Sequence, residues 1–85
     1  MADLQAPTGV LPRPQPVFND AFFRERTRAL GARTDRERCA LAGISKATLR
    51  RWRRGLVTPS LDVLQRVAAR LGVGLGDLLR EAAAA

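Results

Sequence analysis

From Phe18 onward, apolar residues recur at steps of three and four, the spacing that places them on one face of a helix. The pattern predicts five helices, over about residues 20–30, 35–42, 45–54, 59–71 and 75–82. No strand, internal repeat or heptad seam is expected among them. The chain is therefore expected to be all-α, with the apolar faces of its helices packed on one core.

Capping residues mark where these helices begin and end. Thr34 and Glu37 have the S/T-x-x-E spacing of a capping box, and Ser45 precedes the third helix as an N-cap. Asn19 or Asp20 can cap the first helix in the same way. Glycines stand where the helices end: Gly31, Gly43, Gly55 and Gly72.

Residues 1–17 have a different composition. They hold four of the five prolines, each of which fixes φ and removes a backbone donor: Pro7, Pro12, Pro14 and Pro16. We expect a flexible, extended Pro-rich arm without helix or strand. The expected organisation is this arm (1–17), one domain (18–81) and a short Ala tail (82–85).

Charge is distributed unevenly along the chain. The 85 residues include 15 Lys+Arg and 8 Asp+Glu, a formal net charge of +7. No acidic residue lies between Glu37 and Asp62. That interval holds six cations: Arg38, Lys46, Arg50, Arg51, Arg53 and Arg54. A basic segment of this kind indicates an anionic partner, most often nucleic acid.

The composition disfavours several classes of function. The chain has no His, no Tyr and one Cys, which excludes Ser/His/Asp and Cys/His catalytic groups. Its acids are scattered, which argues against a metal-dependent nuclease. We expect no enzymatic activity, no cofactor and no metal. Since no transmembrane run or signal peptide is evident and Cys39 has no second cysteine to pair with, we expect a cytoplasmic protein.

The predicted helix 45–54 separates its charged and apolar residues. At about 100° per residue, one arc holds Lys46, Ala47, Arg50, Arg51 and Arg54, and the opposite arc holds Thr48, Leu49 and Trp52. Leu49 and Trp52 are expected to anchor the helix on the core. The guanidinium groups then face outward, where they can bond phosphates or the O6/N7 edge of guanine. A short helix, a glycine turn and this helix form a helix-turn-helix pattern, whose second helix enters the major groove of DNA.

A recognisable combination is formed by residues 43–55 (GISKATLRRWRRG), 59–61 (PSL) and 67–73 (VAARLGV), with Leu75, Asp77, Leu78 and Leu79. Over about residues 20–80 it resembles the Cro/lambda-repressor (Xre-like) helix-turn-helix family. The resemblance implies a compact five-helix lambda-repressor-like domain that binds operator DNA as a two-fold dimer. It also implies base-reading positions at Lys46, Ala47, Arg50 and Arg51, and phosphate-contacting positions at Thr34, Arg36, Ser45 and Arg54.

The chain departs from the family pattern at four positions. Asp35 stands where the family often has a phosphate-contacting Gln, and Arg38 where it usually buries a Leu. Cys39 replaces a small Ala and is expected to pack as a small hydrophobe. Arg53 replaces a Glu that pairs with a cation of the first helix, and Glu25 is the expected partner of this reversed pair.

The leading hypothesis is a sequence-specific regulator of transcription that binds double-stranded DNA, a small repressor of the phage, plasmid or mobile-element kind. A homodimer formed on an inverted-repeat operator is expected, with contacts around Leu75, Leu78 and Leu79. One alternative is the antitoxin of a toxin–antitoxin pair, which would also bind a toxin or other regulatory protein. Another is an excisionase/MerR-like architectural factor, although a capped helix follows Gly55 where such a module has a β-hairpin wing.

Overall fold

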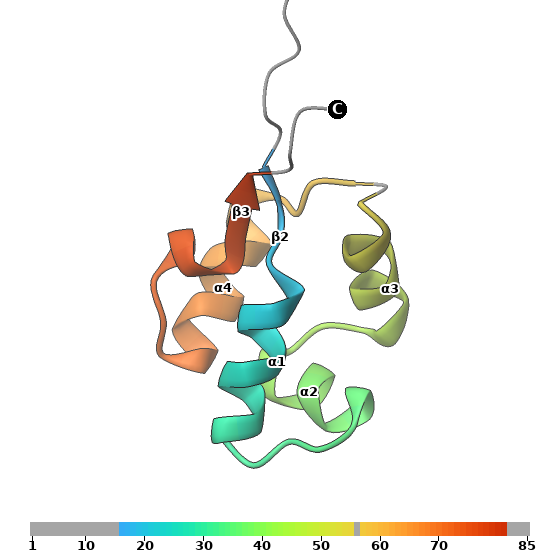
Figure 1. Ribbon diagram of the computed structural model, residues 1–85, viewed down its shortest axis with the longest axis vertical. Coiled ribbons are helices and arrows are strands. Elements are labelled where there is room, and N and C mark those ends of the chain that lie inside the picture. Colours follow the sequence, from blue (N-terminus) through green and yellow to red (C-terminus); the bar gives the residue numbers. More distant parts are fainter. Residues whose placement is uncertain (1–15, 56, 82–85) are drawn as a thin grey trace, which may run out of the picture.

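The computed structural model describes residues 16–55 and 57–81. Its elements, in chain order, are β2 (Pro16–Phe18), α1 (Asp20–Ala29), α2 (Asp35–Ala42), α3 (Lys46–Arg54), α4 (Leu61–Leu71), the 3₁₀ helix η2 (Leu75–Leu78) and β3 (Leu79–Glu81) (Figure 1). The mostly helical architecture confirms the predicted class. The predicted Ala tail and nearly all of the predicted arm lie outside the described residues.

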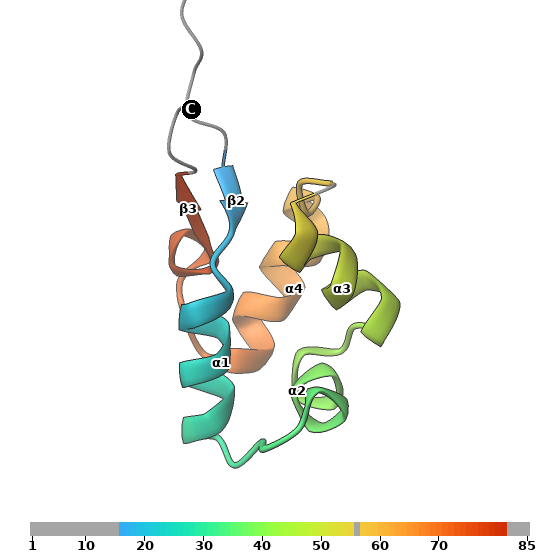
Figure 2. The same ribbon diagram turned by 45° about the vertical axis from the view of Figure 1, so that its right-hand side comes forward.

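The elements surround one core. In Figure 2, α1 and the two strands form one side of the molecule, α2 and α3 form the other, and α4 lies between them. Buried apolar side chains come from every one of these elements except β3: Phe18, Phe23, Cys39, Ala42, Leu49, Trp52, Leu64, Val67, Ala68, Leu71 and Leu78. The core therefore fixes α3 relative to the rest of the domain.

Side-chain caps begin the four α-helices, and three of the capping residues, Asn19, Thr34 and Ser45, are those that the sequence predicts. Asn19 accepts a hydrogen bond from the Phe22 N–H, and Ser60 accepts one from the Val63 N–H. The capping box is complete at α2, because Thr34 accepts from the Glu37 N–H while the Glu37 carboxylate accepts from the Thr34 N–H. Each cap satisfies a backbone donor that the first turn of a helix leaves free.

The C-terminal part of the domain differs from the prediction. In place of a helix over 75–82, a 3₁₀ turn is followed by strand β3, which pairs antiparallel with β2 in the register Pro16↔Glu81, Val17↔Arg80 and Phe18↔Leu79. Expecting no strand in residues 1–17 was thus wrong for Pro16 and Val17. A proline is tolerated at the first position of a strand, and three-residue strands are too short to show alternation in sequence.

The leucines of this region pack inward. Leu78 is 0% exposed, and Leu75 and Leu79 are partly buried against the same core. Leu78 therefore has no free surface for a dimer contact, which corrects that part of the sequence-based expectation.

Candidate nucleic-acid interface

Helix α3 is anchored through its apolar arc. Leu49 and Trp52 are 1% and 5% exposed, and the Trp52 indole lies 5.1 Å from the ring of Phe18, centroid to centroid. Packing of Trp52 in the core, expected from its place on the helix, is confirmed. The opposite arc of α3 is consequently turned away from the core.

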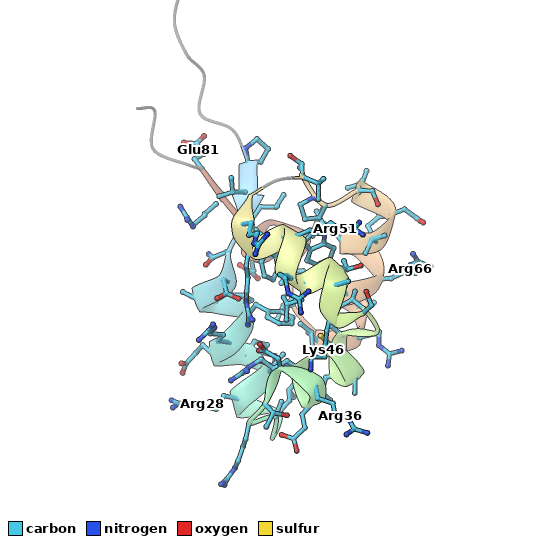
Figure 3. All side chains as sticks on the ribbon, turned by 90° about the vertical axis from the view of Figure 1, so that its right-hand side faces the viewer. Arg28, Arg36, Lys46, Arg51, Arg66 and Glu81 are labelled. Atoms are coloured by element: carbon cyan, nitrogen blue, oxygen red, sulfur yellow. The ribbon has the colours of Figure 1, made fainter. Side chains whose placement is uncertain are left out.

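The outward arc carries the predicted base-reading residues. All five of its members are exposed: Lys46, Ala47, Arg50, Arg51 and Arg54. In Figure 3, which views the molecule onto α3, Lys46 lies near the start of the helix and Arg51 nearer its end, and Arg36 on α2 lies on the side of Lys46 away from Arg51. Within the described part of the chain, Lys46, Arg50, Arg51 and Arg54 form no ion pair. Their charges are therefore directed to solvent.

The predicted phosphate-contacting residues lie at helix ends. Thr34 and Ser45 are exposed N-caps of α2 and α3, and Arg36 is exposed in the first turn of α2. The Ser45 hydroxyl accepts from the Thr48 N–H at 3.0 Å and donates to the Thr48 Oγ1 at 3.0 Å. Helix N-termini present backbone N–H groups and a partial positive charge, which suits an approaching phosphate.

A hollow between the start of α2 and the outward side of α3 adds to this surface. It is lined by Asp35, Lys46, Leu49, Arg50, Arg53 and Arg54. Four cations and one carboxylate border it, so its charge favours an anionic occupant such as a phosphate group.

Arg53 is the exception among the cations of α3. Its Nε donates to Asp20 Oδ1 at 2.7 Å, and its two terminal nitrogens donate to the two oxygens of Asp35 at 2.7 and 3.0 Å. The expected partner Glu25 is wrong, since Glu25 lies 3.7 Å from Arg28 instead. These hydrogen bonds, first those to Asp35, raise the pKa of Arg53 above its ordinary value.

Asp35, which stands where the family often has a Gln, is an ionised carboxylate whose charge is offset by two arginines. Besides the two bonds from Arg53, it accepts one from Arg38 NH1 at 2.7 Å. The Arg53 hydrogen bonds are the largest cause of a pKa of about 2 for this carboxyl, below its ordinary 3.8. Because two guanidinium groups offset its charge, Asp35 is compatible with a neighbouring polyanion.

A scan against family models matches residues 34–78, more than half of the chain, to the helix-turn-helix family of the Cro/C1 type. The chain belongs to this helix-turn-helix family. It is a DNA-binding regulator of transcription that recognises double-stranded DNA. Searches of curated proteins and of solved structures found no match. The family match confirms the resemblance that the turn and the segments around it indicate.

Two further arginines of the helix-turn-helix domain hold pairs of helices together through hydrogen bonds to backbone carbonyls. Arg70 on α4 donates to the carbonyls of Leu41 (2.9 Å) and Ala40 (3.2 Å) at the end of α2, and Arg26 on α1 donates to the Leu71 carbonyl at 2.8 Å. Each satisfies carbonyls that the last turn of a helix leaves free. Neither contact was predictable from the sequence, because each arginine lies at least 29 positions from the carbonyl that it binds.

Cys39 packs within the helix-turn-helix motif. It is 5% exposed in α2, and desolvation raises the pKa of its thiol, so the thiol stays protonated and unreactive at neutral pH. Its expected role as a small packing residue is confirmed.

Metal-ligating side chains do not gather in the described residues: no group of three or more His, Cys, Asp or Glu could hold an ion there. Across the same residues, no helix of the helix-turn-helix domain is both long and apolar enough to cross a membrane.

Proposed function

We propose that the protein is a sequence-specific repressor that inserts α3 into the major groove of its operator. The observation that carries the proposal is the division of α3 into a buried arc, Leu49 and Trp52, and an exposed cationic arc with no ion pairs to the described residues. Neighbouring exposed cations on a helix repel one another, and binding to a polyanion such as DNA relieves this repulsion. Such a repressor acts on DNA in the cytoplasm.

The exposed residues of α3 suit the chemistry of base edges. The Arg50 and Arg51 guanidinium forks can donate two hydrogen bonds to O6 and N7 of guanine, and Lys46 can donate to the same atoms. Ala47 leaves room for the helix to approach and can contact a thymine methyl group. These four residues are the proposed readers of sequence.

Phosphate contacts are assigned to residues around the two helix starts and the end of α3. Arg54 is exposed in the last turn of α3, whereas Thr34, Ser45 and Arg36 lie at or near N-termini. Contacts of this kind fix the orientation of a protein on the duplex but carry no sequence information. We propose that these two groups of residues together form the DNA-binding face of the domain.

The proposed form on DNA is a homodimer on an inverted repeat. A nine-residue recognition helix reaches only about 4–6 base pairs of major groove, too few to select one site in a genome. The alternative of a winged architectural module is disfavoured, because the 11-residue helix α4 follows α3 where a β-hairpin wing would stand.

Salt dependence of binding tests this function. After selection of a cognate duplex from random oligonucleotides, its affinity is measured over a range of salt concentrations. Neutralisation of roughly four to eight phosphates per dimer gives a slope of log K against log salt of about −4 to −7. The double substitution of Arg36→Gln and Arg54→Gln, the two arginines assigned to phosphates, should make the slope shallower by about one unit for each phosphate that is no longer neutralised.

The matched control changes Arg66→Gln and Arg80→Gln, which are exposed on α4 and β3 and remove the same charge. A slope that falls equally in both double variants would show that overall charge, and not the DNA-binding face, determines binding. Absence of binding to any duplex would overturn the proposed function.

A further inference from the structure

One side chain, that of Arg53, links three helices of the domain. Arg53 lies in the last turn of α3, Asp20 in the first turn of α1 and Asp35 in the first turn of α2. The three hydrogen bonds among them measure 2.7, 2.7 and 3.0 Å, and the Arg53 side chain is 20% exposed. Arg53 is thus largely withdrawn from solvent although it lies within a run of exposed cations.

The link acts at a particular place on α3. Leu49 and Trp52 hold the inner arc of the helix, but apolar packing is non-directional and permits small rotations and shifts. The planar Arg53 fork, with three nitrogens committed to two carboxylates on different helices, adds a directional restraint at the C-terminal turn. That turn also carries Arg51 and Arg54, so their angle to the groove depends on it.

We propose that Arg53 is a positioning residue, which sets the orientation of α3 for base reading and does not itself contact DNA. The inference rests on the proposed function and deepens it. Its physical basis is that hydrogen bonds to bases require placement within about 0.5 Å and 10–20° of the productive geometry, which side chains around the site must enforce. Loss of the link lowers discrimination between the cognate site and random DNA more than it lowers binding to DNA in general.

A charge-conserving substitution separates this role from a plain phosphate contact. Arg53→Lys keeps the positive charge but replaces the planar fork with a single ammonium group, which cannot repeat three bonds to two carboxylates. The cognate-to-random affinity ratio should fall about tenfold, the equivalent of removing one bidentate bond pair to a base. The matched control Arg54→Lys, at the exposed neighbouring position, should leave the ratio within about twofold.

Removal of the acidic partners gives a test in which electrostatics and positioning predict different changes of the cognate-to-random affinity ratio. Asp20→Asn and Asp35→Asn each delete a negative charge beside the DNA-binding face, so electrostatics alone predicts tighter binding to every duplex with an unchanged ratio. Positioning by Arg53 predicts that random-DNA affinity rises while the cognate-to-random ratio falls. Asp62→Asn is the control, because Asp62 is exposed on α4 and pairs only weakly, at 3.8 Å, with Arg66.

All affinities are measured at a temperature where circular dichroism shows each variant folded. Should Arg53→Lys not fold, the two Asn variants still decide the question, since each leaves α3 intact. An unchanged ratio in Arg53→Lys, or in both Asn variants, overturns the positioning role. Failure of the wild-type protein to bind any duplex overturns the proposed function instead, so the two failures are distinguishable.

Discussion

The ring of Phe18 lies 5.1 Å from the Trp52 indole, so strand β2 packs directly behind helix α3. Phe18 also contacts Phe23 edge-on at 5.1 Å, which connects this pair to α1. Strand β3 in turn holds β2 in place through their antiparallel pairing. Support for α3 therefore comes from a strand whose first two residues, Pro16 and Val17, belong to the segment that the proline spacing indicated as an arm.

Phe18→Ala should therefore destabilise the whole domain. Removing a buried aromatic ring costs about 3–5 kcal/mol of unfolding free energy, measured by urea denaturation. Leu61→Ala is the control: Leu61 is 59% exposed, and the change should cost less than about 0.5 kcal/mol. If the two variants lose equal stability, β2 does not support the core as described.

Features encoded by neighbouring residues were predictable from the sequence. The capping box Thr34/Glu37, the Ser45 cap and the two arcs of α3 depend on positions a few residues apart, and each is present. The partners of Arg53 were not predictable in this way, because periodicity does not show which of several acids a folded chain brings near. The family pattern correctly placed a partner of Arg53 on helix α1, but it indicated Glu25, whereas the residue of α1 that pairs with Arg53 is Asp20.

The end of the domain illustrates the same limit. Leu75, Leu78 and Leu79 have spacing that suits a helix, yet Gly74 and Gly76 weaken a helix there, and pairing with β2 gives residues 79–81 an extended alternative. A three-residue strand gains its stability only from a partner more than 60 positions away. Local pattern cannot reveal such a partner.

Gly43→Ala should be more destabilising than its backbone conformation alone implies. Gly43 has φ +76°, and a Cβ there would lie 2.9 Å from Arg70 Nε, the group that donates to the Leu41 carbonyl. We expect a loss of about 2–3 kcal/mol in urea denaturation, from left-handed strain plus a disturbed helix end. The matched control is Gly55→Ala: Gly55 has φ +70°, and a Cβ there would have nothing within 4 Å. This variant should lose only about 1–2 kcal/mol of unfolding free energy.

The excess should disappear when Arg70 is changed to Ala, since the clashing side-chain atoms and the hydrogen bonds are then both absent. A double-mutant cycle measures this coupling. Equal losses for the two glycine variants in wild-type background would contradict the proposed contact.

Acid should weaken the Arg53–Asp35 link. The folded-state pKa of Asp35 is about 2, below the ordinary 3.8, chiefly through the Arg53 hydrogen bonds. A depressed pKa contributes stability above the unfolded-state pKa, and that contribution is lost as the pH falls through the folded-state pKa. The difference in free energy of unfolding between wild type and Asp35→Asn should therefore shrink as the pH falls from about 4 to about 2.

The expected change is on the order of 1 kcal/mol, because partial exposure of the carboxylate screens the interaction. Urea denaturation at a series of pH values measures it. In an Arg53→Met background, the effect of Asp35→Asn on the free energy of unfolding should vary much less with pH, since the main cause of the shift is gone. A pH-independent effect in the wild-type background would contradict the assignment.

Arg51 and Arg54 should differ in what their removal does to DNA binding. Arg51→Ala should cost about 1–3 kcal/mol on the cognate duplex and little on random DNA, because it deletes a bidentate contact to guanine. Arg54→Ala should weaken both alike, as removal of a phosphate contact does. Titrations of both variants against both duplexes at one salt concentration measure this, and equal losses for Arg51→Ala would assign it to the phosphate-contacting group.

Two-fold symmetry makes a geometric prediction about the operator. If two copies of α3 enter successive major grooves on one side of the DNA, the centres of the half-sites lie about one helical turn, 10 base pairs, apart. Inserting about 5 base pairs between them rotates one half-site to the opposite side of the DNA, so most of the affinity should be lost. An insertion of about 10 base pairs returns both half-sites to the same side. Affinity is measured for the intact repeat, the two insertions and a single half-site. Equal affinity of the single half-site and the full repeat would show that the protein binds as a monomer.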